Sequence, residues 1–157
     1  MAAILIAAPV SLRSQAPPVK YDEHSPINKF IPFGRDFFKS HRGSVLRHWM
    51  EKYHNSNSEL DGEWHTELHR GFRFEFIRGD RYTKDELGSV VITDPTIPLP
   101  LGLALGDSKE KVLKILGPAA ITKEDSFEYE LSFEMCFLTM RFTRGRLIEI
   151  EISYDHE

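Results

Sequence analysis

Single-residue alternation of apolar and polar side chains dominates the last part of the chain and most constrains its fold. Three segments follow this pattern, with apolar side chains at every second position of 127–133, 138–142 and 148–154. Because successive side chains of a strand point to opposite faces of a sheet, each segment predicts a strand with one buried face. A turn at residues 143–146 (TRGR) joins the last two strands into a hairpin.

A short helix is expected immediately before these strands, in the sequence LGLALGDSKEKVLKILGP. Asp107 can cap its first turn, and Glu110, three positions later, can complete a capping box. Gly117 and Pro118 mark its end, because glycine tolerates a positive φ and proline cannot continue a helix. Its apolar side is expected at Val112, Leu113 and Leu116. A helix this short does not persist alone, so it must dock on the sheet.

The first half of the chain is expected to begin with an irregular arm and a helix. Residues 11–34 contain four prolines (positions 17, 18, 26 and 32), which break regular elements, so residues 1–33 are expected to form an extended arm over the domain. A helix is then expected to start near Gly34 or Ser44 and to end near Tyr53. Its buried side is expected at positions with the spacing of one helix face, Leu46, Trp49, Met50 and Tyr53.

Strands are expected to follow at 63–68, 72–76 and 89–93. In the first of them one side carries tryptophan, threonine and leucine, and the other carries charged residues or histidine. Residues 94–100 (DPTIPLP) are too rich in proline for a helix or a central strand, so they are expected to connect the two halves of the chain.

A shift of 66 residues aligns several positions of the two halves. Phe74 then meets Met140, the pair at 78–79 (RG) meets an identical pair at 144–145, and the expected helices also coincide. This agreement predicts two copies of a helix-then-strands unit, although any two amphipathic units share some apolar periodicity. The predicted fold class is α+β, with two tandem helix-plus-antiparallel-strand units forming one sheet and both helices on one face. We expect a single domain, 1–157, with its units at 34–93 and 101–155.

Charge and cysteine content limit the possible partners and compartments. The formal net charge of −4 comes from residues 98–157, which carry 7 basic and 11 acidic side chains. Nucleic-acid-binding proteins usually show a basic excess, so direct binding of nucleic acid is not expected. A single cysteine excludes an intramolecular disulfide and fits the cytoplasm. The apolar run at 2–10 lacks a preceding basic residue and is too short to span a membrane, so neither a secretory signal nor membrane binding is expected.

The segment LGLALGDSKEKVLKILGPAAI, the acidic alternating strands after it and the terminal LIEIEI strand carry a family resemblance. They resemble the helix–strand–strand module of β-lactamase-inhibitor-like folds over residues 99–155, with a degenerate copy at 34–93. This module recurs in bacterial immunity proteins that neutralise secreted toxins and in small outer-membrane assembly lipoproteins. The lipoprotein branch would require a signal and a lipidated cysteine near the N-terminus, whereas Cys136 lies in a predicted strand. The resemblance therefore implies a toxin-immunity protein.

The segment WHTELHRG is the strongest candidate for a metal site, because His65 and His69 stand four residues apart. Zinc proteases use H-E-x-x-H, however, and here Glu67 stands at a different position. On a strand the two histidines would also lie about 13 Å apart. Cys136 has apolar neighbours, which is typical of a buried thiol. The sequence contains no phosphate-binding, dinucleotide-binding or nucleophile-elbow motif. We therefore expect no catalytic residues, no metal and no cofactor.

An acidic surface on the predicted sheet is the best candidate for a partner-binding site. It consists of six residues, Asp125, Glu128, Glu130, Glu134, Glu149 and Glu151. Carboxylates on neighbouring strands repel one another, and this arrangement becomes useful when a basic partner binds. The alternatives are a solvated sheet face without a specific role and a paired-carboxylate catalytic site.

The leading functional hypothesis is a cytoplasmic immunity protein, without enzymatic activity, that occludes the active site of a cognate secreted bacterial toxin. The expected partner is a basic protein toxin, such as one whose active site binds nucleic acid. The alternative is a non-enzymatic adaptor or structural protein of the bacterial envelope or secretion apparatus. A third hypothesis is a metal enzyme that uses His65, Glu67 and His69.

Overall fold

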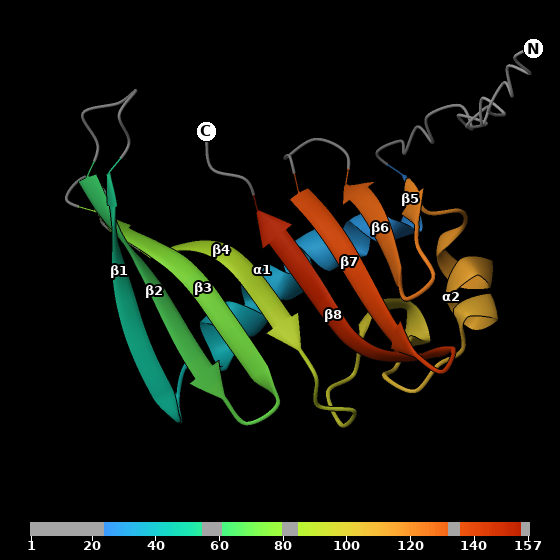
Figure 1. The fold of residues 1–157 in the computed structure, drawn as a ribbon, viewed down its shortest axis with the longest axis horizontal. Helices are drawn as coiled ribbons and strands as arrows, with labels where there is room; N and C mark the ends of the chain where they lie inside the picture. The colour runs from blue at the N-terminus through green and yellow to red at the C-terminus, as the bar shows by residue number, and fades with distance from the viewer. Residues whose placement is uncertain (1–23, 55–60, 80–84, 132–135, 155–157) are drawn as a thin grey trace, which may run out of the picture.

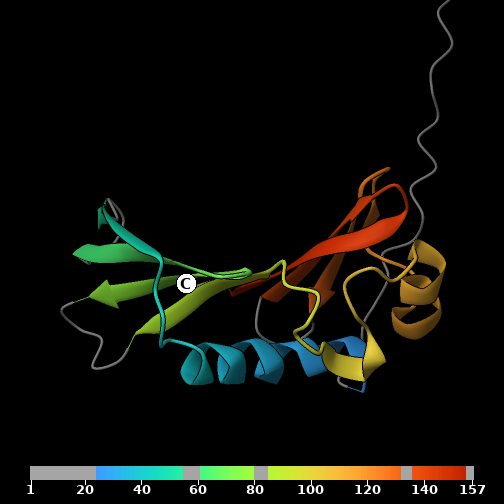
Figure 2. The ribbon, with the colours of Figure 1, turned by 90° about the horizontal axis from the view of Figure 1, so that it is seen from below.

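The computed structural model describes residues 24–54, 61–79, 85–131 and 136–154. Within these residues, eight strands form one open antiparallel sheet and two α-helices pack on one of its faces (Figures 1 and 2). The strand order is β1-β2-β3-β4-β8-β7-β6-β5, so that strands from the two halves of the chain meet at β4 and β8. The α+β fold class and the single sheet agree with the prediction.

The first helical segment lies earlier in the chain than predicted. Residues 26–33, expected in an extended arm, form the 3-10 helix η1 (Pro26–Lys29) and the start of α1 (Phe30–Ser40). Pro26 and Pro32 both occupy first-turn positions, where a backbone N–H has no partner inside the helix. The prolines therefore begin these helices instead of preventing them. Residues 1–23 of the predicted arm lie outside the described part of the chain.

Helix α1 crosses the sheet (Figure 2). Three of its phenylalanines, Phe30, Phe37 and Phe38, are buried in the core. It approaches β8 (Arg146–Tyr154) closely at Gly34, where an added Cβ would lie 2.3 Å from the hydroxyl oxygen of Tyr154. That hydroxyl donates a hydrogen bond of 2.8 Å to the carbonyl of Ile31. The absence of a side chain at Gly34 thus lets β8 bind the helix backbone directly.

Residues 47–54 form strand β1 (Arg47–His54), so the predicted helix ending near Tyr53 is wrong. Strand β1 pairs along its whole length with β2 (Asp61–His69). Two of the side chains expected on a buried helix face, Leu46 and Met50, are 65% and 49% exposed. A helix with this 3.6-residue spacing would have no surface on which to bury its apolar side. As a strand, the segment instead has its backbone hydrogen-bonding groups paired with those of β2. The helical part of the 66-residue alignment fails for the same reason.

The remaining elements agree better with the predicted strands and connector. The connector at 94–100 leads into the short 3-10 helix η2 (Pro100–Gly102). The other strands and the second helix are, in chain order, β3 (Phe72–Gly79), β4 (Glu86–Ile92), α2 (Lys109–Leu116), β5 (Ile121–Thr122), β6 (Ser126–Leu131) and β7 (Cys136–Thr143). Only the two-residue strand β5 has no counterpart in the prediction for this half.

The ends of α2 differ in detail from the prediction. Ser108, not Asp107, is the N-cap, and its hydroxyl accepts a hydrogen bond of 3.2 Å from the Lys111 N–H. Gly117 ends the helix with a φ of 81°, as expected. Leu113 is 39% exposed and does not join the buried side of the helix.

The core lies between the helices and one face of the sheet. It is built from alternate residues of the central strands, such as Phe74 of β3, Val90 of β4 and Ile152 of β8, which are fully buried. Cys136 is also buried, as its apolar neighbours indicated. Ile148 breaks the alternation expected for β8 and is exposed, because the register between β7 and β8 shifts there. No helix of the described residues has the length and apolar character needed to cross a membrane.

Candidate protein-binding surface

The face of the sheet opposite α1 and α2 is covered by no described element (Figure 2). We term it the outer face. Seen edge-on, the two halves of the sheet rise away from α1 on either side of the centre, so the outer face is concave (Figure 2). An antiparallel sheet normally keeps such a face polar and solvated. Its composition therefore decides whether it is merely a solvated surface or a candidate for binding.

The predicted acidic residues of β6 and β8 do share the outer face. Glu128 lies opposite Thr139 of β7, and Thr139 lies opposite Glu151 of β8. Glu149 lies opposite Arg141, whose guanidinium donates hydrogen bonds both to Glu149 and, at 3.0 Å, to Glu151. The repulsion expected among these carboxylates is therefore relieved by an arginine between them.

The other predicted acidic residues have different surroundings. Glu128 pairs with Lys123 at 2.5 Å, whereas Glu130 is exposed and makes no ion pair within the described residues. Asp125 is exposed in the turn between β5 and β6, where its carbonyl accepts a hydrogen bond of 2.7 Å from the Phe142 N–H. Glu134 lies outside the described residues.

The first half of the outer face contains a pocket that the sequence did not indicate. It has a volume of about 320 Å³ and is lined by Trp49, Glu51, Trp64, Thr66 and Glu75. Strand register explains the grouping, because Trp49 of β1 lies opposite Thr66 of β2, which lies opposite Glu75 of β3. Trp49 and Trp64 are the two tryptophans of the chain.

Trp64 is held on the outer face by a close contact with β4. A Cβ added at Gly88 would lie 2.4 Å from Cζ3 and 2.8 Å from Cη2 of the indole. The register between β3 and β4 shifts at this point, between Glu75 and Phe76, as in a β-bulge. The missing side chain at Gly88 therefore makes room for the indole ring against the backbone.

The carboxylates of the pocket differ in their partners. Glu75 accepts a hydrogen bond of 3.2 Å from the Ser89 hydroxyl and forms an ion pair of 3.2 Å with Arg73. Glu51 is exposed and has no ion pair within the described residues. The guanidinium of Arg47 lies 5.3 Å from the centre of the Trp49 ring. Aromatic rings and carboxylates on this half of the face thus already bind guanidinium groups of the chain itself.

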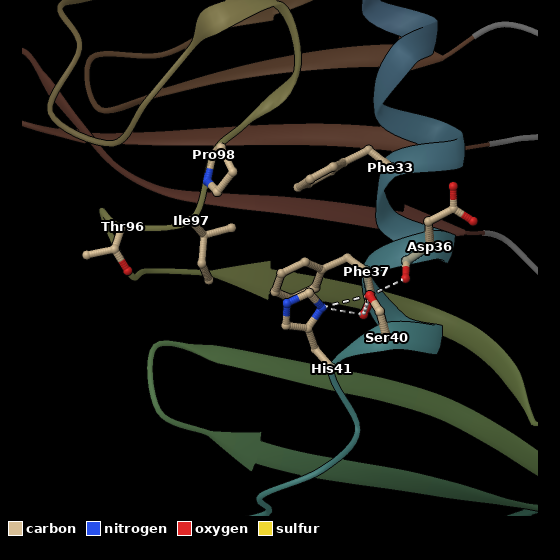
Figure 3. Close-up of a pocket in the computed structure, with 8 residues that line it drawn as sticks. All are labelled: Phe33, Asp36, Phe37, Ser40, His41, Thr96, Ile97 and Pro98. Atoms are coloured by element: carbon tan, nitrogen blue, oxygen red, sulfur yellow. Dashed lines mark hydrogen bonds between the residues drawn. The ribbon is translucent and has the colours of Figure 1, made fainter.

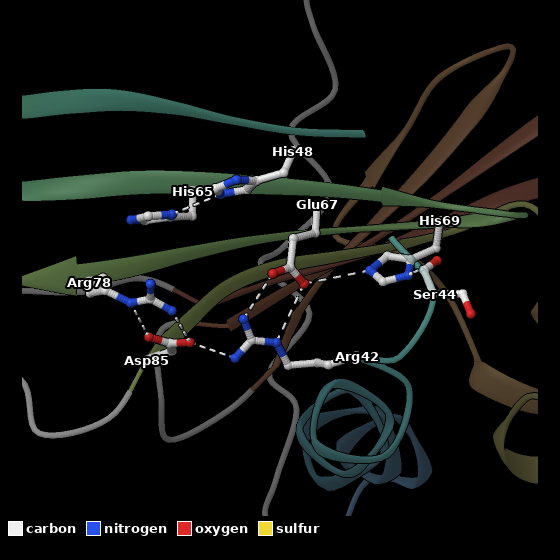
Figure 4. A network of polar contacts seen from close by, with 8 residues as sticks. All are labelled: Arg42, Ser44, His48, His65, Glu67, His69, Arg78 and Asp85. Atoms are coloured by element: carbon white, nitrogen blue, oxygen red, sulfur yellow. Dashed lines mark hydrogen bonds and ion pairs between the residues drawn. The ribbon is translucent and has the colours of Figure 1, made fainter. Parts of the chain in front are cut away.

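Beneath the same strands, on the side of α1, lies a partly buried polar network (Figure 4). Arg42, just after α1, donates hydrogen bonds to Glu67 (2.9 and 3.4 Å) and to Asp85 (2.5 Å). Arg78 also binds Asp85, at 2.8 and 3.0 Å. These two guanidiniums, Arg78 first, lower the pKa of Asp85 to about 2 against the effect of burial. The network ties the segment after α1 to β2, to β3 and to the residue that precedes β4.

The histidines of WHTELHRG are part of this buried side and do not converge. His65 lies 2.9 Å from His48, ring nitrogen to ring nitrogen, whereas Nδ1 of His69 lies 3.0 Å from the Ser44 carbonyl. Glu67 binds Arg42 (Figure 4). The described residues contain no group of three or more histidine, cysteine, aspartate or glutamate side chains that could hold a metal ion. The alternation in β2 is as predicted, but its polar side faces inward.

A second pocket, of about 450 Å³, lies between α1 and the connector (Figure 3). Its walls are mainly apolar, with Phe33, Phe37 and Ile97 among them. The ring of His41 stacks on Phe37 with the ring centres 4.0 Å apart, and the Ser40 hydroxyl donates 2.6 Å to the Asp36 carbonyl. The Ser40 and His41 side chains thus bind other parts of α1, and the Thr96 hydroxyl donates a hydrogen bond to Asp94 in the connector. The pocket therefore suits an apolar group.

Comparison of the chain with known protein families, curated proteins and solved structures finds no match. The class defined by the fold and by the outer face is an α+β protein with one open antiparallel sheet whose concave face is covered by none of the described elements.

Proposed function

We propose that the outer face binds another protein, and that through it the chain acts as an immunity protein that occludes the active site of a cognate bacterial toxin. The carrying observation is a concave sheet face that carries both tryptophans and that no described helix or strand covers. Exposed aromatic side chains in a hollow are typical of the anchors of protein interfaces. Phe137 extends the aromatic surface onto β7, where it is 44% exposed.

Electrostatics favours a basic partner. The glutamates placed on the outer face by register include Glu51, Glu75, Glu128, Glu130, Glu149 and Glu151, and they outnumber the arginines Arg47, Arg73 and Arg141. A negative concave surface attracts a positively charged protein and accelerates its encounter. A toxin that acts on nucleic acid has such a basic cleft, and covering it would block access of the substrate.

The proposal includes an internal duplication of the fold. One half consists of α1 followed by β1–β4, and the other of α2 followed by β5–β8. The antiparallel pairing of β4 with β8, with Val90 opposite Ile152, sets the halves side by side. This element order supports two related units, each a helix followed by four strands. In this correspondence α1 matches α2, so the shift of 66 residues, which paired residues of β1 with α2, no longer applies.

Co-expression tests the proposal. The toxin gene to use is one that adjoins the reading frame of this chain, and we expect its expression to be lethal unless this chain is expressed with it. Glu130→Lys should weaken the rescue and the binding of the purified toxin at least tenfold. Asp36→Lys, which makes the same charge change on α1, should leave both unchanged. Failure of the wild-type chain to rescue would refute the immunity function.

The alternative, a non-enzymatic adaptor of the bacterial envelope or secretion apparatus, is favoured by one observation. Arg141 neutralises Glu149 and Glu151 within the chain, so this part of the face offers less free charge than its glutamates suggest. An adaptor interface of this kind would be largely insensitive to salt. Binding of a basic toxin should weaken strongly between low and high ionic strength.

A further inference from the structure

We propose that the pocket between Trp49 and Trp64 binds one arginine side chain of the partner protein. The inference rests on the proposed function in one respect only, that the arginine belongs to a protein that binds the outer face. It assigns the chemistry of the anchor, which the proposed function leaves open.

The pocket places aromatic and acidic side chains in alternation on neighbouring strands. Trp49 and Glu51 follow one another on the outer side of β1, and Trp64 lies directly opposite Glu51. The two tryptophans are therefore diagonal neighbours, about 7–8 Å apart at this position in a sheet. A planar group stacked between two rings needs a gap of that size. The volume of about 320 Å³ accommodates a single long side chain.

Arginine satisfies this combination better than other side chains. Its guanidinium stacks flat on an indole ring while its N–H groups, which lie in the plane, bind carboxylates at the edge. Glu51 and Glu75 both line the pocket, and Glu51 has no ion pair within the described residues. An arginine entering between the rings would supply the cation that Glu51 lacks. Lysine offers a point charge and cannot stack in the same way.

Two arginines of the chain itself already make the two kinds of interaction that are proposed for the partner's arginine, one with a tryptophan ring and one with a carboxylate. Arg47 lies over the Trp49 ring, and Arg73 forms an ion pair with Glu75. Neither of them lines the pocket. Among the described residues, neither arginine therefore fills the pocket between the tryptophans. The contact of Trp64 with Gly88 fixes one wall in advance, which lowers the entropy lost when a side chain enters.

Both tryptophans of the chain line this pocket, so their indole N–H signals report directly on binding. The probe is the peptide acetyl-Gly-Arg-Gly-amide, titrated into the ¹⁵N-labelled full chain. We expect both indole signals to shift and to saturate with a Kd of about 1 mM, the strength of a few contacts. The citrulline peptide has the same shape without the charge and should bind at least tenfold more weakly. No saturable shift, or equal binding of the two peptides, would overturn the proposal.

Two matched variants separate a specific pocket from general attraction to an acidic face. Glu51→Gln should weaken peptide binding at least tenfold, because it removes the free carboxylate of the pocket. Glu130→Gln removes the same charge from the other half of the outer face and should change binding less than twofold. Equal losses in both variants would show general attraction and contradict the arginine pocket.

The peptide titration requires no toxin, so the two proposals fail separately. Peptide binding without rescue in the co-expression test would refute the immunity function and leave the arginine pocket in place. Rescue by the chain without peptide binding would refute the pocket alone. An Arg→Gln scan of the toxin then tests the pocket in the complex, where one arginine should account for most of the loss caused by Glu51→Gln.

Discussion

Replacement of Arg42 by methionine should destabilise the protein markedly, because Arg42 is the central cation of the polar network. Arg42 binds two carboxylates, those of Glu67 and Asp85, whose side chains are only 12% and 16% exposed. Its guanidinium carbon also lies 4.5 Å from the ring centre of Phe76 and 4.8 Å from that of Phe38. Methionine retains the aliphatic packing on these rings and removes the charge and all the hydrogen bonds.

The expected loss follows from what remains after the change. Removal of one partner from a buried ion pair costs about 3–5 kcal/mol, because a charge is left in a poorly solvated place. Arg42 is itself 30% exposed, and Asp85 keeps its bonds to Arg78. Glu67 keeps only His69, at 3.6 Å. We therefore expect Arg42→Met to lower the free energy of unfolding by about 2–3 kcal/mol.

Urea unfolding followed by circular dichroism measures this change without relying on the tryptophans. For a chain of this size the same loss lowers the melting temperature by about 5–10 °C. Combining Arg42→Met with Glu67→Gln in a double-mutant cycle should give a coupling energy of about 1 kcal/mol or more. A loss below about 0.5 kcal/mol, as for ordinary surface changes, would refute the structural role assigned to Arg42.

Two further predictions concern Gly88 and Asp85. Gly88→Ala should cost about 1–3 kcal/mol and shift the tryptophan emission, because its Cβ would lie 2.4 Å from Trp64; Gly43→Ala, with nothing within 4 Å of its Cβ, is the control and should change neither. The pKa of Asp85 is lowered from 3.8 to about 2 in the folded state, so its stabilisation is present above about pH 4 and is lost as the pH falls through 2. Asp85→Asn should therefore reduce the free energy of unfolding by about 1–2 kcal/mol at about pH 5 and by much less at about pH 2, and an equal deficit at both would contradict the ion pairs.

The strands of the second half follow from local sequence because each of them alternates regularly and packs one face on the core. The caps of α2 and the hairpin at 144–145 likewise depend on neighbours within a few residues. The position of β1 depends instead on β2, a partner further along the chain, and its side chains have a spacing that suits a helix equally well. Pro26 and Pro32 were misinterpreted because proline breaks a helix only after its first turn.

The composition of the outer face follows from the sequence only in part, for a similar reason. Alternation in 63–69 shows that β2 has two different sides, but it does not show which side is buried. The histidines and Glu67 face α1 because Arg42 and Ser44 satisfy them there, and Trp64 is consequently turned to the outer face. Arg42 lies 25 residues from Glu67, so no local pattern reveals the pair. The glutamates of β6 and β8 are different, because the alternation of side chains along each strand is enough to place them on one face of the sheet.

The outer face also has a thin packed layer of its own, and this layer bears on how it would bind. Val91 is only 5% exposed although no described helix covers it, and it lies between Arg73 of β3 and Glu151 of β8. Ile77 is 7% exposed and lies opposite Trp64. Long side chains of the outer face therefore already lie on apolar neighbours before any partner arrives. Because their rotamers are restricted in the free protein, less side-chain entropy is lost on association than for a freely solvated sheet face.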